Sequence, residues 1–222
     1  MITVSIDGTA GSGKSTTAKL VSKKLGFLYI DTGAMYRAAT LLVIISGVDP
    51  NDEKSVVNIV QKSDIKLESE DGEIRVLLNK KDVTKEIRSP KVTRLVSLIS
   101  SYHKVREFLV DLQRGMAENN SVVCEGRDIG TVVFPNANVK IYLDCSIEER
   151  AKRRFLDLKR ANVTTNIEEV KQDIINRDRM DSEREFSPLK IPDGAEIIDT
   201  TNFTIKEQVE QVLDLVYSRE GI

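Results

Sequence analysis

The chain has 222 residues, of which 40% are hydrophobic and 31% are charged, and this balance is typical of a soluble globular protein. A formal net charge of −2 excludes an overall basic field for binding nucleic acid, and the longest apolar stretch, residues 38–45, is too short to span a bilayer. The single histidine, His103, excludes a multi-histidine metal site, and Cys124 and Cys145 are expected to be buried thiols.

The beginning of the chain predicts two strands that alternate with two helices. Residues 2–7 are a short β-branched apolar run typical of a buried strand, and a glycine-rich turn and a helix that ends at Gly26 follow. Residues 27–31 predict a second strand and residues 34–46 an apolar helix. Alternating strands and helices favour a parallel sheet with helices on both faces.

After a helix that Asp52 is expected to cap, apolar and polar residues alternate in two runs, 65–67 and 74–78. Asp71-Gly72 between these runs is typical of a tight hairpin turn. Because this antiparallel patch lies between helices, we expect it to belong to an inserted lobe over about residues 38–87 and not to a domain of its own.

The second half of the chain predicts the remaining elements. Three further buried strands are predicted at residues 122–125, 139–144 and 195–199. Helices are predicted over residues 105–116 and 167–184. Three more helices are predicted to start at Ser89-Pro90 and at the capping boxes Ser146/Glu149 and Thr204/Glu207.

The sharpest motif is GTAGSGKS at residues 8–15, which matches the phosphate-binding pattern GxxxxGK[ST] between a predicted strand and a predicted helix. Its glycines let the backbone curl around phosphate oxygens, and the positive end of the next helix faces the same anion. Lys14 is expected to reach the β- and γ-phosphates, and the Ser15 hydroxyl to hold Mg²⁺. We therefore expect ATP on Gly8, Thr9, Ala10, Gly11, Ser12, Gly13, Lys14, Ser15 and Thr16.

The predicted architecture is thus a single α/β domain of the P-loop type with a parallel five-stranded sheet flanked by helices. Its core covers about residues 1–37, 88–150 and 166–222. The inserted lobe carries the antiparallel strands, and a short lid is expected at about residues 151–165.

Arginines gather in three segments that follow predicted strands or lie late in a helix, at residues 31–37, 125–130 and 177–184. The planar fork of arginine grips phosphate with two hydrogen bonds, which suits the crowded anions of phosphoryl transfer. Arg177, Asp181 and Arg184 share one helix face by their spacing. Each segment also has a plainer interpretation as a solvated face or a surface turn, so none of them decides the function alone.

Together these segments closely resemble the bacterial cytidylate kinases, a family of nucleoside monophosphate kinases. The most specific piece is GRDIGTVVFP at residues 126–135. The other matching segments are residues 8–15, 31–37, 105–107, 149–154 and 177–184, and they keep the family's order across almost the whole chain. Thr32 stands where the family usually has serine, which keeps the hydroxyl.

The resemblance implies ATP as donor and CMP or dCMP as acceptor, with Lys14, Arg37, Arg127 and Asp128 as the catalytic residues. It implies that CMP is held by Thr32, Tyr36, Arg37, Ser97, Arg106, Arg127, Asp128, Arg177, Asp181 and Arg184. It further implies that the lid contributes Arg153 and Arg154, with Arg160 beside them, to the ATP site.

Within that set the resemblance divides the roles by the parts of CMP. The phosphate falls to Arg37 and Arg127, with Tyr36 close by, and the sugar hydroxyls fall to Arg177 and Asp181.

The cytosine falls to Ser97, Arg106, Asp128 and Arg184. A carboxylate suits the N4 amino donor of cytosine, whereas the C4 carbonyl of uracil would face it badly. Such a buried mismatch costs about 1–3 kcal/mol, so UMP is expected to be a poor substrate. We expect dCMP, which lacks only the 2′-hydroxyl, to be accepted.

Two rival functions remain open at this point. A GTPase switch would need a guanine-reading Asn-Lys-x-Asp motif, and the only such letters, residues 79–82, fall in the predicted antiparallel patch. A kinase for UMP, AMP or a sugar acid would keep the P-loop but not the cytosine-reading residues. We expect a cytoplasmic monomer that binds neither nucleic acid nor membranes, since the first residues lack a signal-peptide pattern and no apolar stripe is left over.

Overall fold

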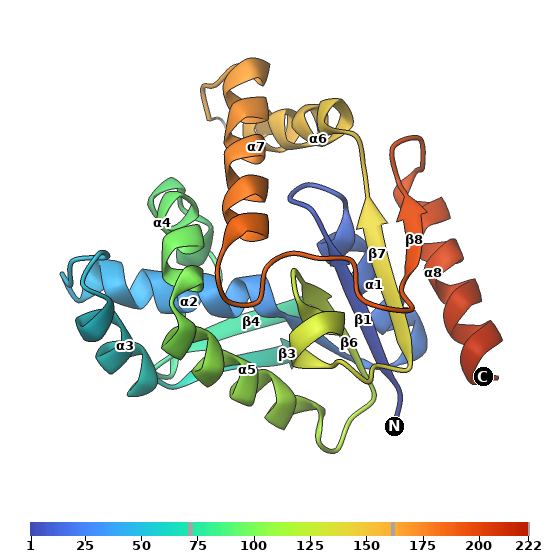
Figure 1. The fold of residues 1–222 in the computed structure, drawn as a ribbon, viewed down its shortest axis with the longest axis horizontal. Helices are drawn as coiled ribbons and strands as arrows, with labels where there is room; N and C mark the ends of the chain where they lie inside the picture. Colours follow the sequence, from blue (N-terminus) through green and yellow to red (C-terminus); the bar gives the residue numbers. More distant parts are fainter. Residues whose placement is uncertain (71–72, 161–162, 222) are drawn as a thin grey trace.

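A computed structural model describes residues 1–70, 73–160 and 163–221 (Figure 1). The first half of the chain forms β1 (Thr3–Gly8), α1 (Lys14–Leu25), β2 (Leu28–Asp31), α2 (Thr32–Ile45), α3 (Glu53–Gln61), β3 (Ile65–Glu70), β4 (Glu73–Leu78), β5 (Lys81–Asp82) and the 3₁₀ turn η1 (Glu86–Arg88). The second half forms α4 (Pro90–Ser101), α5 (His103–Ala117), β6 (Val122–Gly126), the π-helical turn η2 (Ile129–Val133), β7 (Val139–Asp144), α6 (Ile147–Arg160), α7 (Ile167–Glu183), β8 (Glu196–Asp199) and α8 (Ile205–Glu220).

The main sheet has five strands in the order β2-β6-β1-β7-β8, and every neighbouring pair is parallel. This confirms the predicted parallel sheet. β1 lies at its centre, with Asp7 opposite Gly126 of β6 and Tyr142 of β7. In such sheets ligands bind at the carboxyl ends of the strands, so the chain segments that leave β1, β2 and β6 frame the site.

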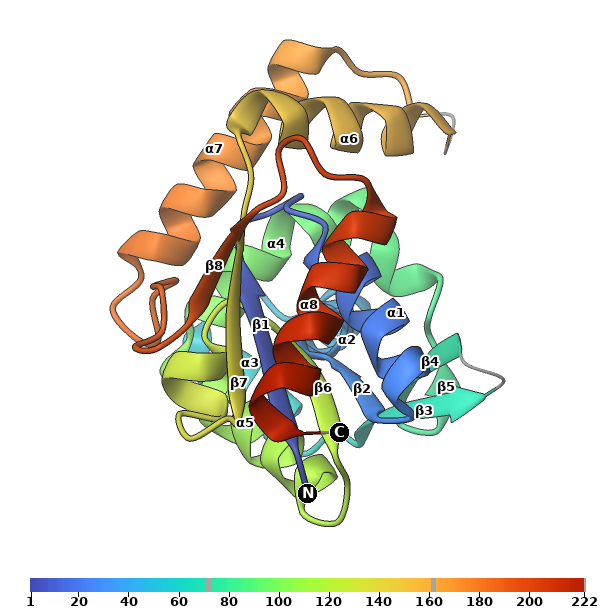
Figure 2. The same ribbon diagram turned by 90° about the vertical axis from the view of Figure 1, so that its right-hand side faces the viewer.

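Helices cover both faces of this sheet, as predicted (Figures 1 and 2). Helices α1 and α8 pack on one face, against a core that contains Val4, Ile6 and Val123. Helices α2, α4 and α5 lie on the other face, where Val122 and Cys124 belong to a second core. The alternation along β6 is the two-residue period of a strand that is buried on both sides.

The antiparallel patch forms a second sheet of order β3-β4-β5. The predicted pairing of β3 with β4 is confirmed, and the Asp71-Gly72 turn lies outside the described residues. β5 was not predicted. Asn79 and Lys80, the first letters of the GTPase-like motif, are the turn between β4 and β5, with φ of 50° and 68°.

Residues of this second sheet share a buried core with the main sheet and its helices. Ile65, Val76 and Leu78 belong to the same buried cluster as Ile30 of β2 and Met35 of α2. The apolar faces of β3 and β4 therefore support α2, which leads directly from the carboxyl end of β2.

Two helix caps differ from the prediction. Pro90 occupies the first turn of α4 as expected, but the Ser89 side chain makes no capping hydrogen bond. Ser146 Oγ accepts from the backbone N–H of Glu149 at 3.3 Å, whereas the Ser146 N–H donates to Thr201 Oγ1, so only half of that capping box forms.

Other local predictions agree with the structure. The capping box between Thr204 and Glu207 forms in both directions at the start of α8. Cys124 and Cys145 are free and buried. Within the described ranges, no helix combines the length and the apolar character needed to cross a membrane.

Candidate active site

The P-loop joins β1 to α1 in a conformation that only glycine fits at two positions. A Cβ on Gly8 would lie 2.3 Å from the carbonyl oxygen of Leu143 on β7. Gly13 has φ of 93°, and a Cβ there would lie 2.7 Å from Gln208 Oε1 of α8. These close approaches seat the loop on β7 and α8, so its outer side is left for a ligand.

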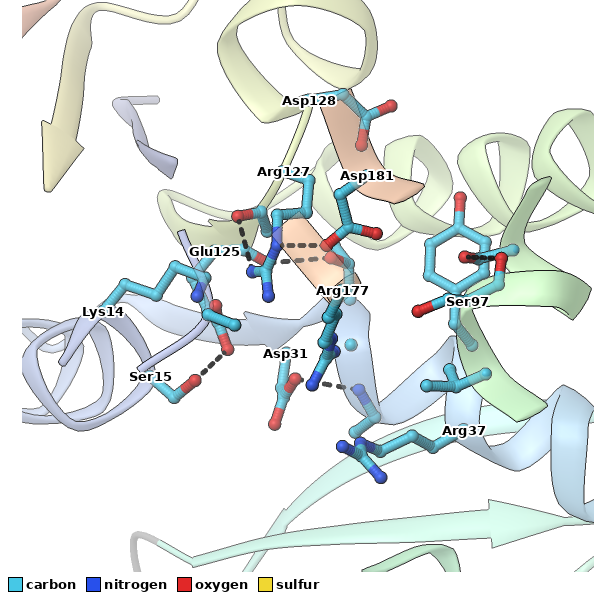
Figure 3. Close-up of a pocket in the computed structure, with 18 of the residues that line it drawn as sticks. Lys14, Ser15, Asp31, Arg37, Ser97, Glu125, Arg127, Asp128, Arg177 and Asp181 are labelled. Atoms are coloured by element: carbon cyan, nitrogen blue, oxygen red, sulfur yellow. Dashed lines mark hydrogen bonds and ion pairs between the residues drawn. The ribbon is translucent and has the colours of Figure 1, made fainter. Parts of the chain in front are cut away.

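A pocket opens beside this loop at the carboxyl ends of β1, β2 and β6 (Figure 3). In Figure 3, Lys14 and Ser15 lie on one side and Ser97 on the other, with Arg127 and Arg177 between them. The predicted site residues that line the pocket are Ala10, Gly11, Lys14, Ser15, Thr32, Tyr36, Arg37, Ser97, Arg106, Arg127, Asp128, Arg177, Asp181 and Arg184. One cavity therefore collects residues from five separate segments of the chain.

Cations crowd the middle of this pocket. Burial and the charges of Arg127 and Arg177 lower the pKa of Lys14 to about 7. Burial and the neighbouring charges of Arg177 and Arg154 lower the pKa of Arg37 to about 10. Burial, Arg127 and Arg154 do the same to Arg177, whose pKa is also about 10. Mutually repelling cations held close together form a site for an anion with several negative charges.

One carboxylate offsets part of this charge. Arg127 Nε donates to Asp181 Oδ2 at 2.9 Å, and both side chains are largely buried. Burial raises the pKa of Asp181, but Arg127 and Arg177 outweigh it and hold the net pKa below its usual value. Asp181 is therefore an ionised group beside the cation cluster, and it links α7 to the segment after β6.

The inner end of the pocket holds a buried cluster around Asp128. Arg106 Nη2 donates to Asp128 Oδ2, and Arg184 Nη2 lies 3.6 Å from Asp128 Oδ1. Arg106 Nη1 donates to the Ser100 carbonyl, and its Cζ lies 5.0 Å from the centre of the Tyr36 ring. Tyr36, which was expected near the CMP phosphate, thus supports the arginine at the inner end.

Two carboxyl groups, those of Glu125 and Asp31, line the pocket together with Ser15 on the opposite side. Ser15 Oγ donates to Glu125 Oε1 at 2.6 Å. Burial and the charge of Glu125 raise the pKa of Asp31 to about 7, although Asp31 accepts the N–H of Ala34. Two carboxyl groups beside a P-loop hydroxyl are hard oxygen ligands of the kind that a divalent cation prefers.

Asp31 and Glu125 lie in segments that the sequence singles out, but neither residue was predicted to have a role. Their position as the last polar residues of β2 and β6 was the available signal, because adjacent strand ends converge. Arg88 of η1 also lines the pocket and was missed. Thr32 lines it too, although its hydroxyl donates to the Glu125 carbonyl within the sheet.

Several residues predicted to bind ATP do not line this pocket: Gly8, Thr9, Ser12, Gly13, Thr16, Arg153 and Arg154. Thr9 supports the P-loop instead, since its carbonyl accepts from Lys14 Nζ at 2.9 Å. Arg153 Nη2 donates to the Thr200 carbonyl at 2.7 Å, so it ties α6 to the loop after β8. Arg154 is exposed, but its charge acts on the cation cluster.

Comparison with known proteins gives the family of the chain. The profile of the cytidylate kinase family matches residues 4–218. The chain belongs to the cytidylate kinase family. Curated relatives named cytidylate kinase include one from Caldanaerobacter subterraneus subsp. tengcongensis, 50% identical over 97% of this chain and 94% of the relative. Another, from Lactobacillus johnsonii, is 46% identical over 99% of this chain and 96% of the relative.

A solved structure of a protein from Eubacterium ventriosum has a similar fold. Its TM-score is 0.56 at 11% sequence identity, and the match covers 99% of this chain and all of that one. This likeness concerns the fold alone.

Proposed function

We propose that this protein is an ATP-dependent nucleoside monophosphate kinase that transfers the γ-phosphoryl group of ATP to CMP and dCMP. One observation carries the proposal. A single pocket joins the P-loop lysine, Lys14, to a cluster of arginines and then to the buried carboxylate of Asp128. Membership of the cytidylate kinase family gives the same reaction.

On the donor side, the P-loop backbone from Gly8 to Ser15 and the start of α1 receive the phosphates of ATP. Lys14 is drawn into its charged form when these anions arrive, because they offset the burial that lowers its pKa to about 7. Its ammonium group then stabilises the charge that spreads over the transferred phosphoryl group.

Ser15, Asp31 and Glu125 fit Mg²⁺. The Ser15 hydroxyl would hold the ion, with the carboxyl groups of Glu125 and Asp31 beside it. When bound, Mg²⁺ offsets negative charge on the phosphates.

On the acceptor side, Arg37 and Arg127 hold the CMP phosphate, and Arg177 and Asp181 hold the ribose hydroxyls. Arg37 is pre-oriented, since its Nη1 donates to Thr93 Oγ1 at 2.9 Å and to the Ile87 carbonyl at 3.3 Å. Arg127 is oriented by Asp181. No covalent intermediate is needed. A CMP phosphate oxygen attacks the γ-phosphorus in line while the bond from that phosphorus to the β–γ bridging oxygen breaks and ADP leaves, so the two groups only have to be positioned.

Cytosine binds at the inner end. Asp128 accepts from the N4 amino group, and Arg106, Arg184 and Ser97 offer donors to N3 and O2. The two arginines contact Asp128 from both sides, which fixes the orientation of its carboxylate. UMP, whose C4 carbonyl meets this carboxylate, is the poorer acceptor.

The segments around the pocket close during turnover. Arg88, which lines the pocket, directly follows the lobe over about residues 38–87. The lid over about residues 151–165 contains Arg153 and Arg154. Ala161 and Asn162 of that lid lie outside the described residues. Closure brings Arg154 toward the phosphates and excludes water, which is a competing acceptor.

The test is a coupled ADP-release assay with ATP and Mg²⁺ against CMP, dCMP, UMP, AMP, GMP and shikimate. We expect CMP and dCMP to give the highest kcat/KM, with UMP behind them. Preference for another acceptor would leave the P-loop assignment intact and remove the proposed roles of Ser97, Arg106, Asp128 and Arg184.

A further inference from the structure

Asp7 is a fully buried carboxylate that none of the roles above uses. It lies at the carboxyl end of β1, directly before the P-loop. Its Oδ1 accepts the backbone N–H of Ile129 at 2.7 Å, and its Oδ2 accepts that of Gly130 at 2.8 Å. Both oxygens are therefore committed to the first two residues of η2, the turn that follows Asp128.

These two bonds fix the turn that carries the acceptor-binding residues. The N–H groups at the start of a helical turn have no partner within it, and a carboxylate is a strong acceptor for them. The turn is also packed tightly, since a Cβ on Gly130 would lie 2.8 Å from Pro192 and 3.0 Å from Ser5 Oγ. Arg127 and Asp128 stand immediately before this anchored turn.

The P-loop does not depend on the Asp7 side chain in the same way. The backbone of β1 is held by parallel pairing to β6 on one side and β7 on the other. Gly8 and Gly13 seat the loop on β7 and α8 by close contact. The two side-chain bonds of Asp7 go to the acceptor turn alone.

We propose that Asp7 is a positioning residue for the acceptor side, which sets Arg127 and Asp128 at a fixed place relative to the P-loop on the same strand. The inference rests on the proposed function. Asp7 links the donor loop, one residue away along β1, to the residues that hold the acceptor phosphate and base. It touches neither substrate.

The charge state of Asp7 fits this role. The ionised carboxylate is the stronger acceptor for both N–H groups, because each of its oxygens carries part of the negative charge. Burial, with the Asp128 charge, raises the pKa of Asp7 to about 7, although the two N–H bonds and Lys14 act in the opposite direction. Burial therefore disfavours the ionised form of Asp7, and the two N–H groups and the charge of Lys14 stabilise it.

The test compares Asp7→Asn with Ser5→Ala in the full-length protein. Asparagine keeps the shape but turns an amide donor toward one of the two N–H groups. Ser5→Ala is the matched control, because Ser5 lies on the same strand near Gly130 and its Oγ has no hydrogen-bond partner among the described residues. We expect kcat/KM for CMP to fall by about tenfold or more in Asp7→Asn, since a hydrogen bond to a charged group is lost. The KM for ATP should stay within about twofold, and Ser5→Ala should match the wild type in both.

The outcomes separate the inference from the function on which it rests. An unchanged kcat/KM for CMP, or a KM for ATP that rises by as much as kcat/KM for CMP falls, would overturn the positioning role while leaving the kinase assignment intact. A wild-type protein that does not phosphorylate CMP would remove the proposed function and this inference together. If Asp7→Asn does not fold, Asp7→Ser, which leaves one acceptor oxygen, is measured in its place.

Discussion

The ion pair between Arg150 of α6 and Asp178 of α7 should stabilise the protein strongly, because it holds the P-loop between two helices. Asp178 Oδ1 accepts the Ala10 N–H at 3.0 Å, and Arg150 Nη1 donates to the Ala10 carbonyl at 3.1 Å and to Asp178 Oδ2. Both side chains are mostly buried. Replacing Asp178 with alanine removes the carboxylate that both the Arg150 guanidinium and the Ala10 N–H use as an acceptor.

The expected loss follows from what remains. Breaking a buried pair by removing one partner costs about 3–5 kcal/mol. Arg150 keeps the carbonyls of Cys145 and Ala10 as acceptors, so the loss should lie near the lower end, at about 3 kcal/mol. For a chain of this length that lowers the thermal midpoint by about 6–12 °C.

Thermal unfolding followed by circular dichroism measures this loss. Asp173→Ala is the matched control, since Asp173 is an exposed aspartate on the same helix and should change the midpoint by less than about 2 °C. Arg150→Met should cost less in the Asp178→Ala background than in the wild type, because the two groups act as a unit. A midpoint in Asp178→Ala equal to that of the control would refute the reasoning.

Three further predictions concern the buried charges of the site. Lys14→Met should lower kcat roughly a hundredfold or more at an unchanged thermal midpoint. Asp128→Ala should raise the KM for CMP by more than about tenfold and leave that for ATP nearly constant. Because folded Asp7 has a pKa of about 7 against 3.8 ordinarily, the folded state binds its proton more tightly, and this group's contribution to stability falls as pH rises between these values. The free energy of unfolding is measured without ligands for the wild type and for Asp7→Asn at about pH 5 and about pH 8. Its change between the two pH values should differ between the two proteins by a few kcal/mol. Near-normal turnover by Lys14→Met would contradict the first prediction, and equal rises in KM for CMP and ATP in Asp128→Ala would contradict the second. The third would be contradicted if the stability of Asp7→Asn and of the wild type changed equally with pH.

Much of the fold could be predicted because its signals are local. The five strands of the main sheet are short apolar runs rich in β-branched residues, and Gly26 and the Thr204/Glu207 capping box mark helix ends. β5 has only two residues, Lys81 and Asp82, and carries no hydrophobic pattern, so it could not be predicted. Ser89 has the right residue type for a cap, but its side chain does not make the bond.

The candidate site was predictable where a motif names its residues and not where the fold sets distances. The P-loop pattern indicates phosphate binding directly, whereas the roles of Arg127 and Asp128 in the GRDIG turn come from the resemblance to a known family. That Glu125 lies beside Ser15, or that Asp7 reaches the turn after Asp128, follows from the strand order β2-β6-β1-β7, which no local pattern encodes. Arg153 was assigned to ATP by its place in the lid, yet it bonds Thr200 because of its phase on α6.

A competition experiment tests the central claim most directly. Equal concentrations of CMP and UMP are mixed with limiting ATP and Mg²⁺, and the CDP and UDP formed are separated by chromatography, so that their ratio gives the ratio of the two kcat/KM values. The proposed reading of cytosine by Asp128 predicts CDP in excess by about tenfold to a hundredfold in the wild type, and a smaller excess in Asp128→Ala. Equal amounts of CDP and UDP from the wild type would contradict it.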